Sequence, residues 1–179
     1  MNSNSSFEEV YDAYKKLVYN LALNYVQNYR DAEDITQEVF IKIYQQLSTH
    51  DSSLSSLKTW VCKVTIHQCI DAARAKRTKK RLGFVVSLFK KDSNEPEFDE
   101  VVSTHPGIAA EDKEQLNSLL KLINELPDNQ KTVLLLLKSE DLTQREVAAI
   151  MEISVKAVES LLQRAKNTLQ KKLDAREGF

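Results

Sequence analysis

The scarcity of turn-forming residues is the feature that most limits what this chain can fold into. Only three glycines and three prolines occur in 179 residues. Leu, Lys, Glu, Gln and Ala are abundant instead, and these residues favour helices. No alternation of polar and apolar residues is long enough to argue for a strand, apart from a short apolar run at 84–89. The sequence therefore predicts an all-α protein.

Two helical domains are expected, at residues 5–82 and 113–175. Residues 83–112 between them hold two of the three glycines and two of the three prolines, which is typical of a linker without its own core. Acids dominate the second half of this linker. A second interpretation, left open, is that the acidic segment mimics nucleic acid or lies in a basic channel of a partner.

The net charge of -1 hides a strong segregation of sign. Residues 72–91 contain eight bases and no acid, whereas residues 92–114 contain eight acids and one base. Nucleic-acid binding depends on the local patch and not on the total charge. The basic block follows directly on an apolar helix, and this favours a phosphate-binding surface over a solvated tail.

Residues 31–40 predict an amphipathic helix with an unusually acidic outer face. One stripe at helical spacing is acidic and amide-rich except for its last member and should face outward: Asp34, Gln37, Glu38 and Ile41. Another is apolar and should be buried: Ile35, Val39, Ile43 and Leu47. Asp31 is expected to cap this helix. A plain solvated face would give the same pattern.

The third helix is expected from Leu57 to Lys80 and becomes more basic along its length. It carries the single tryptophan, Trp60, which could stack on an unpaired base or simply belong to the core. Both interpretations stay open from the residues alone.

A helix-turn-helix is predicted near the end of the chain. Thr143 and Glu146 fit a capping box, a short helix then runs to about Met151, and the turn 152–154 precedes a longer final helix. The outer face of that last helix carries small, polar and cationic residues suited to a major groove: Lys156, Ala157, Glu159, Ser160, Gln163 and Arg164. A polar solvated face is the simpler alternative.

Three separated motifs occur in an order that resembles the extracytoplasmic-function (ECF) group of bacterial sigma factors. They are the acidic helix at 31–40, the segments 57–61 and 69–74, and a third group spanning 126–131, 143–148, 153–160 and 164–165. The resemblance covers both blocks. It implies two helical domains without enzymatic activity or cofactor, which bind core RNA polymerase and read the -10 and -35 promoter elements.

The resemblance also implies roles for individual positions. A polymerase-binding face is expected from Asp31, Glu33, Asp34, Gln37, Glu38 and Ile41. Contacts with the -10 element are expected from Lys58, Trp60, Lys63, His67, Asp71, Arg74, Lys76 and Arg77. The six outer-face residues of the last helix should read the -35 element. An anti-sigma factor is a further partner that the family implies.

Three departures from the family pattern affect DNA reading. His67 stands where the family usually has Asn, which makes the choice of base in the -10 element uncertain. Glu152 stands where Gly is usual, because the residue that ends a helix often takes a positive φ. Glu159 replaces a common base and could accept a hydrogen bond from cytosine.

Other functions fit the residues less well. Cys62, His67 and Cys69 could suggest zinc, but 62, 66 and 69 share a helix face that excludes 67, so packing of the two cysteines is favoured. No phosphate loop, nucleophile motif or metal-spaced cluster points to an enzyme. An adaptor protein would not need two basic surfaces. The main rival is a free-standing helix-turn-helix repressor, whose first domain would need no acidic face.

A cytoplasmic location is expected. The first residues, Met1–Ser6, lack the basic and apolar regions of a signal peptide. No apolar stretch reaches the 18 or more residues of a membrane span, so no direct membrane insertion is expected.

Overall fold

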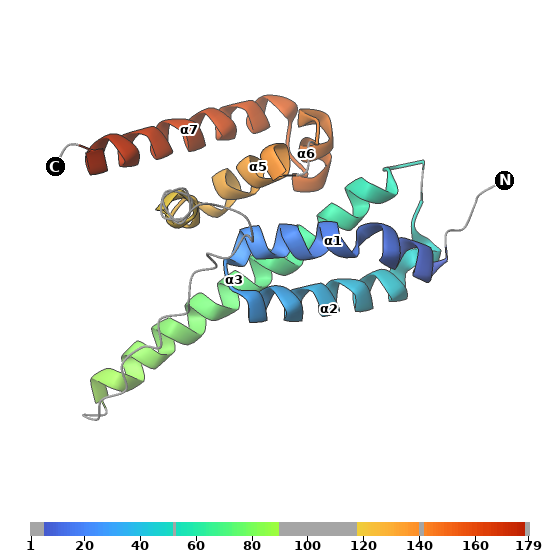
Figure 1. The fold of residues 1–179 in the computed structure, drawn as a ribbon, viewed down its shortest axis with the longest axis horizontal. Helices are drawn as coiled ribbons and strands as arrows, with labels where there is room; N and C mark the ends of the chain where they lie inside the picture. The colour runs from blue at the N-terminus through green and yellow to red at the C-terminus, as the bar shows by residue number, and fades with distance from the viewer. Residues whose placement is uncertain (1–5, 52, 90–117, 140–141, 178–179) are drawn as a thin grey trace, which may run out of the picture.

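The computed structural model describes residues 6–51, 53–89, 118–139 and 142–177 (Figure 1). It contains the helices α1 (Phe7–Val26), α2 (Tyr29–Gln46), α3 (Leu57–Phe89), α5 (Asp128–Ser139), α6 (Gln144–Met151) and α7 (Val155–Glu177). A 3-10 turn at Leu47–Thr49 follows α2, and residues 118–124 are also helical. No strand occurs within these described ranges, and the all-α prediction is confirmed.

The first three helices form an N-terminal bundle in which α1, α2 and α3 all contact one another. Apolar residues at helical spacing fill its centre, and the largest fully buried side chains include Leu21, Ile43 and Ile66. The predicted inner stripe of α2 is confirmed for Ile35, Val39 and Ile43, which are all buried. Leu47 is only half-buried, because α2 ends at Gln46 and Leu47 begins the 3-10 turn.

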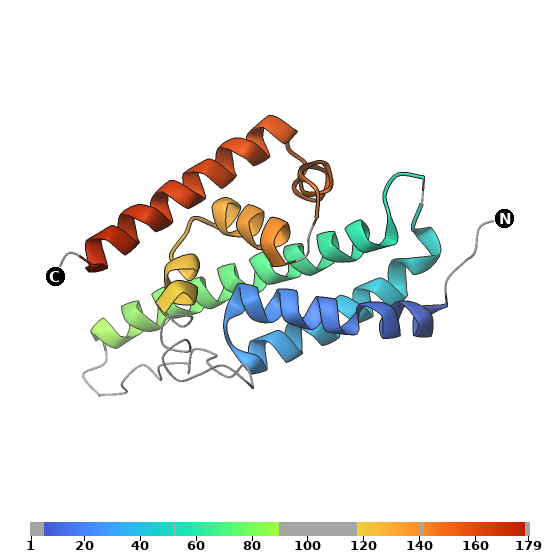
Figure 2. The same ribbon diagram turned by 45° about the horizontal axis from the view of Figure 1, so that its top comes forward.

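A C-terminal domain is built from residues 118–124, α5, α6 and α7. Leu122, Leu136 and Ile150 are nearly inaccessible in its interior, and Val158 and Ala165 anchor α7. Figures 1 and 2 show this domain lying along α1 and α3. The contacts run between α1 and α5 and between α3 and α6. Buried apolar residues of the two domains form one continuous cluster.

The sequence predicted how two helices, α2 and α6, begin, and one of the two predictions is confirmed. The capping box of α6 is confirmed: Glu146 N donates to Thr143 Oγ1 at 3.3 Å, and Thr143 N donates to the Glu146 carboxylate at 2.8 Å. The expected cap at Asp31 is wrong. α2 begins at Tyr29, because the Asn28 side chain accepts from Asp31 N at 2.9 Å.

The third helix is longer than expected. α3 continues past Lys80 to Phe89, so residues 83–89, which the sequence assigned to the linker, are helical. A single glycine at position 83 costs a helix only about 1 kcal/mol relative to alanine, and no proline follows until Pro96. The short apolar run at 84–89 belongs to this helix and not to a strand.

Candidate functional site

The acidic stripe of α2 faces outward along most of its length. Asp34, Gln37, Glu38 and Ile41 are exposed, as their helical spacing predicted, and Glu33 is exposed as well. Ile41 keeps 57% of its surface accessible, which is high for a large aliphatic side chain. The stripe therefore combines carboxylates, an amide and an apolar side chain on one accessible face.

Two members of the predicted polymerase-binding set make contacts within the bundle. Asp31 is half-buried, and its carboxylate lies 3.1 Å from Lys76 Nζ on α3. Glu38 accepts a hydrogen bond from the buried Gln68 of α3, whose own carbonyl accepts from Lys42. These contacts tie the acidic face of α2 to the basic helix beside it.

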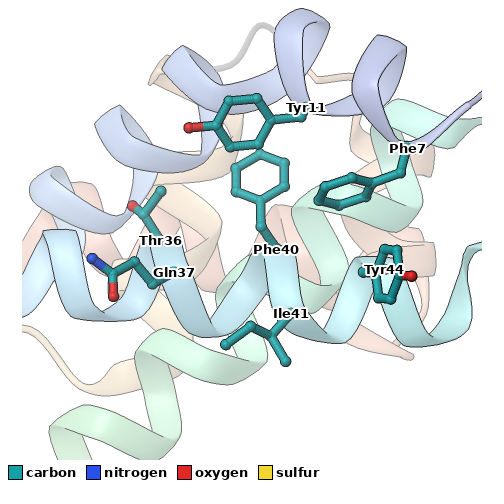
Figure 3. A pocket seen from close by; sticks show the side chains of 7 residues that line it. All are labelled: Phe7, Tyr11, Thr36, Gln37, Phe40, Ile41 and Tyr44. Atoms are coloured by element: carbon teal, nitrogen blue, oxygen red, sulfur yellow. The ribbon is translucent and has the colours of Figure 1, made fainter.

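An apolar groove lies beside this stripe, between α1 and α2 (Figure 3). It has a volume of about 430 Å³ and is lined by Phe7, Tyr11, Thr36, Gln37, Phe40, Ile41 and Tyr44. Aromatic rings form most of its wall. The Tyr11 and Phe40 centroids are 4.7 Å apart, and the Phe7 and Tyr44 rings meet edge to face at 5.2 Å.

Sequence reasoning missed this groove. The 7/11 and 40/44 pairs, each one helical turn apart, were the available signal, but that spacing is equally typical of core residues. Tyr44 is instead 68% exposed. Gln37 and Ile41 belong both to the acidic stripe and to the groove, so the two features form one surface.

The proposed -10 residues lie along α3 and differ in exposure. His67, Asp71, Arg74, Lys76 and Arg77 are exposed, whereas Lys58, Trp60 and Lys63 are half-buried. His67, Asp71 and Arg74 lie on successive turns and form an accessible row.

Trp60 is packed at the edge of the core and stacks on His50, with centroids 4.8 Å apart and an interplanar angle of 24°. No role was predicted for His50, which lies in a polar loop. One face of the indole is thus covered by the loop that precedes α3.

Cations of this helix contact acids of the C-terminal domain. Lys63 Nζ lies 2.6 Å from Glu152 Oε1, and Arg77 Nη2 lies 2.6 Å from Asp128 Oδ1. The hydrogen bond from Lys63 lowers the pKa of Glu152 below its usual value, and His67 acts in the same direction. Sequence reasoning could not see these pairs, since the partners lie far apart in the chain.

The helix-turn-helix is formed as the sequence predicted. α6 ends at Met151, and Glu152 takes a left-handed conformation with φ 56° and ψ 41°. This is the position where glycine would be free of the Cβ penalty. On α7, Lys156, Glu159, Ser160, Gln163 and Arg164 are exposed and Ala157 is half-buried, so the proposed -35 residues share an accessible face.

A buried lysine sits where the two domains meet. Lys131 of α5 is only 4% exposed, and its Nζ lies 4.5 Å from the centre of the Tyr25 ring of α1. Burial lowers the pKa of Lys131 to about 8, and burial raises the pKa of Tyr25 and that of Cys69 to about 12. Lys131 Nζ also donates to Asn124 Oδ1 at 2.5 Å.

The cysteines pack in the bundle core. Cys62 and Cys69 are both free thiols and fully buried, whereas His67 points away into solvent. Throughout the part of the chain that the structure describes, no group of three or more His, Cys, Asp or Glu side chains is placed to hold a metal ion. Nor is any helix there both long and apolar enough to cross a membrane.

Comparison with known proteins identifies a matching family for each of the two domains. The family described as Sigma-70 region 2 matches residues 10–79, and that described as Sigma-70, region 4 matches residues 116–169. The ECF RNA polymerase sigma factor SigW of Bacillus subtilis is 28% identical, over 94% of this chain and 89% of SigW. SigM of the same organism is also 28% identical, over 92% of this chain and 93% of SigM.

Two solved structures share the fold. One is the sigma factor RpoE of Bartonella quintana in complex with the anti-sigma factor NepR, with a TM-score of 0.68 and 18% identity, covering 94% of this chain and 96% of RpoE. The other is CnrH in complex with the cytosolic domain of CnrY, with a TM-score of 0.67 and 19% identity, covering 94% and 88% of the two chains.

Proposed function

The chain belongs to the ECF group of sigma-70 factors, which direct transcription initiation by RNA polymerase, and we propose that the acidic stripe and the apolar groove of α2 together bind core polymerase. The supporting observation is that Gln37 and Ile41 belong to both features. A polymerase helix with basic residues on one edge and apolar residues on the next would match this surface. Charge would orient the approach, and apolar burial would supply most of the affinity.

The six predicted positions do not have equal roles in this proposal. Asp34, Gln37 and Ile41 face solvent and are assigned direct contact. Asp31 and Glu38 contact Lys76 and Gln68 of α3, so they also position the stripe relative to the DNA-binding helix. Glu33 lies at the exposed edge and contributes charge.

Promoter reading is proposed for two further surfaces. The row on α3 would bind the -10 element, with Lys and Arg neutralising phosphates and Trp60 offering its edge to an unpaired base. The outer face of α7 would enter the major groove of the -35 element. Two domains with the limits 5–82 and 113–175 stay part of this proposal, except that α3 extends the first domain to Phe89, into the segment 83–112 that was expected to join them.

The remaining expectations follow from the family. The chain would act by binding and not by catalysis, within the cytoplasm. RpoE and CnrH each form a complex with a second protein, and in the case of RpoE this is an anti-sigma factor. An anti-sigma partner is proposed for this chain on the same grounds.

Retention on immobilised core polymerase tests the proposed surface. The double variant Asp34→Lys, Ile41→Asp should lose retention, because it reverses a charge and places a carboxylate at the groove. Asp174→Lys, an exposed acid on α7, is the matched control and should bind like the wild type. Equal retention of the double variant would refute the assignment to α2. Binding of promoter DNA by the free protein, without polymerase, would favour the repressor alternative.

A further inference from the structure

Two exposed amide side chains, Gln163 and Asn167, lie one turn apart on the outer face of α7. Gln163 Nε2 donates a hydrogen bond to Asn167 Oδ1 at 3.0 Å. The opposite face of α7 packs inward through Val158 and Ala165, which are fully buried. Because residues four apart on a helix share a face, the pair points away from the core of the domain. Asn167 was not among the residues expected to read the -35 element.

The direction of this hydrogen bond decides what Gln163 offers to DNA. The Oδ1 atom of Asn167 only accepts hydrogen bonds, so the amide nitrogen of Gln163 must turn toward it. The carbonyl oxygen of Gln163 and its second N–H are then left for another partner. One acceptor beside one donor matches the major-groove edge of adenine, which presents the N6 amino group and the N7 acceptor. Guanine presents two acceptors, O6 and N7, and its O6 would meet the Gln163 carbonyl with repulsion.

The two amides differ in how far they lie along the helix. Recognition helices read base edges mainly with their N-terminal residues. Gln163 is eight residues after Val155, where α7 begins, or about 12 Å along the axis, and a major groove is about 12 Å wide. Asn167 lies about 6 Å further, beyond the span that the base edges occupy. Gln163 is therefore placed to reach a base, and Asn167 is placed to hold Gln163.

Neighbouring cations add affinity but no choice of base. Lys156 and Arg164 are exposed on the outer face of α7 and are placed to neutralise phosphates. Phosphate contacts fix the position of a protein on DNA and carry no direct sequence information. The choice of base at the position that Gln163 reaches thus depends on Gln163 and on the partner that fixes its amide.

We propose that Gln163 reads an adenine in the -35 element and that Asn167 is a positioning residue, which selects this base by fixing the direction of the Gln163 amide. The inference rests on the proposed function, because it requires α7 to enter the major groove of that element. It adds a base identity and a second residue to that function. A pre-positioned amide also loses less conformational freedom when it binds DNA.

Selection of promoter DNA by the holoenzyme tests this proposal. The full-length protein in complex with core polymerase is mixed with a double-stranded library randomised over both promoter elements, and the bound DNA is sequenced. The wild type should prefer adenine over each other base by about tenfold at one -35 position, as expected for a bidentate contact. Gln163→Ala should reduce this preference to within about twofold, at that position alone. Unchanged base preferences in Gln163→Ala would overturn the proposal.

Three substitutions at Asn167 test its positioning role. Asn167→Asp keeps an acceptor opposite the amide nitrogen, so the adenine preference should remain. Asn167→Lys offers only donors, so it should draw the Gln163 carbonyl toward itself, and the preference should change from adenine to guanine. Asn167→Ala removes the partner and should weaken the adenine preference about fivefold. Added charge changes the affinity for all sequences alike, so the ratio between bases reports the direction of the amide. An unchanged adenine preference in Asn167→Lys would overturn the positioning role.

The matched control is Gln170→Ala. It breaks the hydrogen bond from Gln170 Nε2 to Asp174 Oδ1 at 2.7 Å, which has the same spacing on the same helix but lies further from its N-terminus. Its base preferences should equal those of the wild type. A wild-type preference for guanine at the position that depends on Gln163 would overturn the inference. If no sequence is enriched by the wild-type holoenzyme, the proposed function fails together with it, whereas enrichment that is independent of Gln163 and Asn167 refutes this inference alone.

Discussion

Replacing the buried Lys131 with methionine should not destabilise the protein at pH 7, although it removes a charged group with two contacts. The pKa of this lysine falls from 10.5 to about 8 on burial, which corresponds to a cost of about 3 kcal/mol for keeping it charged at neutral pH. The contact with Tyr25 offsets up to about 2 kcal/mol and the bond to Asn124 about 1 kcal/mol. Methionine keeps the apolar stem, so the unfolding free energy should change by less than about 1 kcal/mol.

The pH dependence is the sharper part of this prediction. Because the pKa of Lys131 is lower in the folded protein, the unfolded chain binds more protons between pH 8 and 10.5. Burial of the charge is costly below pH 8, and wild-type stability should recover as the pH rises through this window. Relative to Lys131→Met, the wild type should gain about 1 kcal/mol between pH 7 and pH 9.

Urea unfolding followed by far-ultraviolet circular dichroism at the two pH values measures this difference. Cys69 acts in the opposite direction, because its raised pKa contributes stability that is lost above about pH 9. Lys131 lowers the pKa of Cys69, so its removal only raises that pKa further. The folded thiol therefore stays protonated up to pH 9 in both proteins, and its effect cancels over this range. Lys121→Met changes an exposed lysine of the same domain and should show no such pH dependence. A variant destabilised by more than about 2 kcal/mol at both pH values would show that the Lys131 charge is net favourable and refute this reasoning.

Three further predictions concern single sites. Thr143→Ala removes the side-chain cap of α6 and should lower the unfolding free energy by about 1 kcal/mol, measured by urea denaturation; Thr143→Ser should keep the cap. Cys62 and Cys69 are fully buried, and burial raises the Cys69 pKa, so an aromatic disulfide reagent should modify them at least a hundredfold more slowly in native protein than in urea. Equal rates would contradict their place in the core. Tyr44→Asp should weaken core polymerase binding at least tenfold without changing the thermal midpoint by more than a few degrees, since Tyr44 is exposed beside the groove.

Patterns among residues close in the sequence were enough to predict most of the helices. The capping box at Thr143 and the apolar stripe of α2 depend on residues three or four positions apart. The capping box occurs as predicted, and so does the stripe from Ile35 to Ile43. Errors arose where two local signals competed. Asn28 and Asp31 are both good caps, and the backbone conformation at Asn28 decided between them. Gly83 was expected to start the linker, but α3 continues through it to Phe89. One glycine costs a helix only about 1 kcal/mol, which is too little to end it when the residues on both sides favour a helix.

The contacts between domains could not be predicted from spacing. Lys63 and Glu152 look like ordinary surface charges in the sequence, and only the fold brings them together. Lys131 begins an apolar run and would be expected at its solvent edge, yet it lies under Tyr25. The apolar groove was missed for a related reason. Whether an aromatic pair at helical spacing is core or surface depends on how far the neighbouring helix extends over it.

The length of the unbroken α3 determines where the chain leaves the N-terminal bundle. From Trp60 to Phe89 it rises about 44 Å, so the chain departs toward the second domain far from the stacked indole. A deletion of four residues within the distal half would shorten α3 by about 6 Å and rotate its C-terminal end about the helix axis by about 40°. The length of this one helix therefore sets the point from which the connection to the C-terminal domain starts.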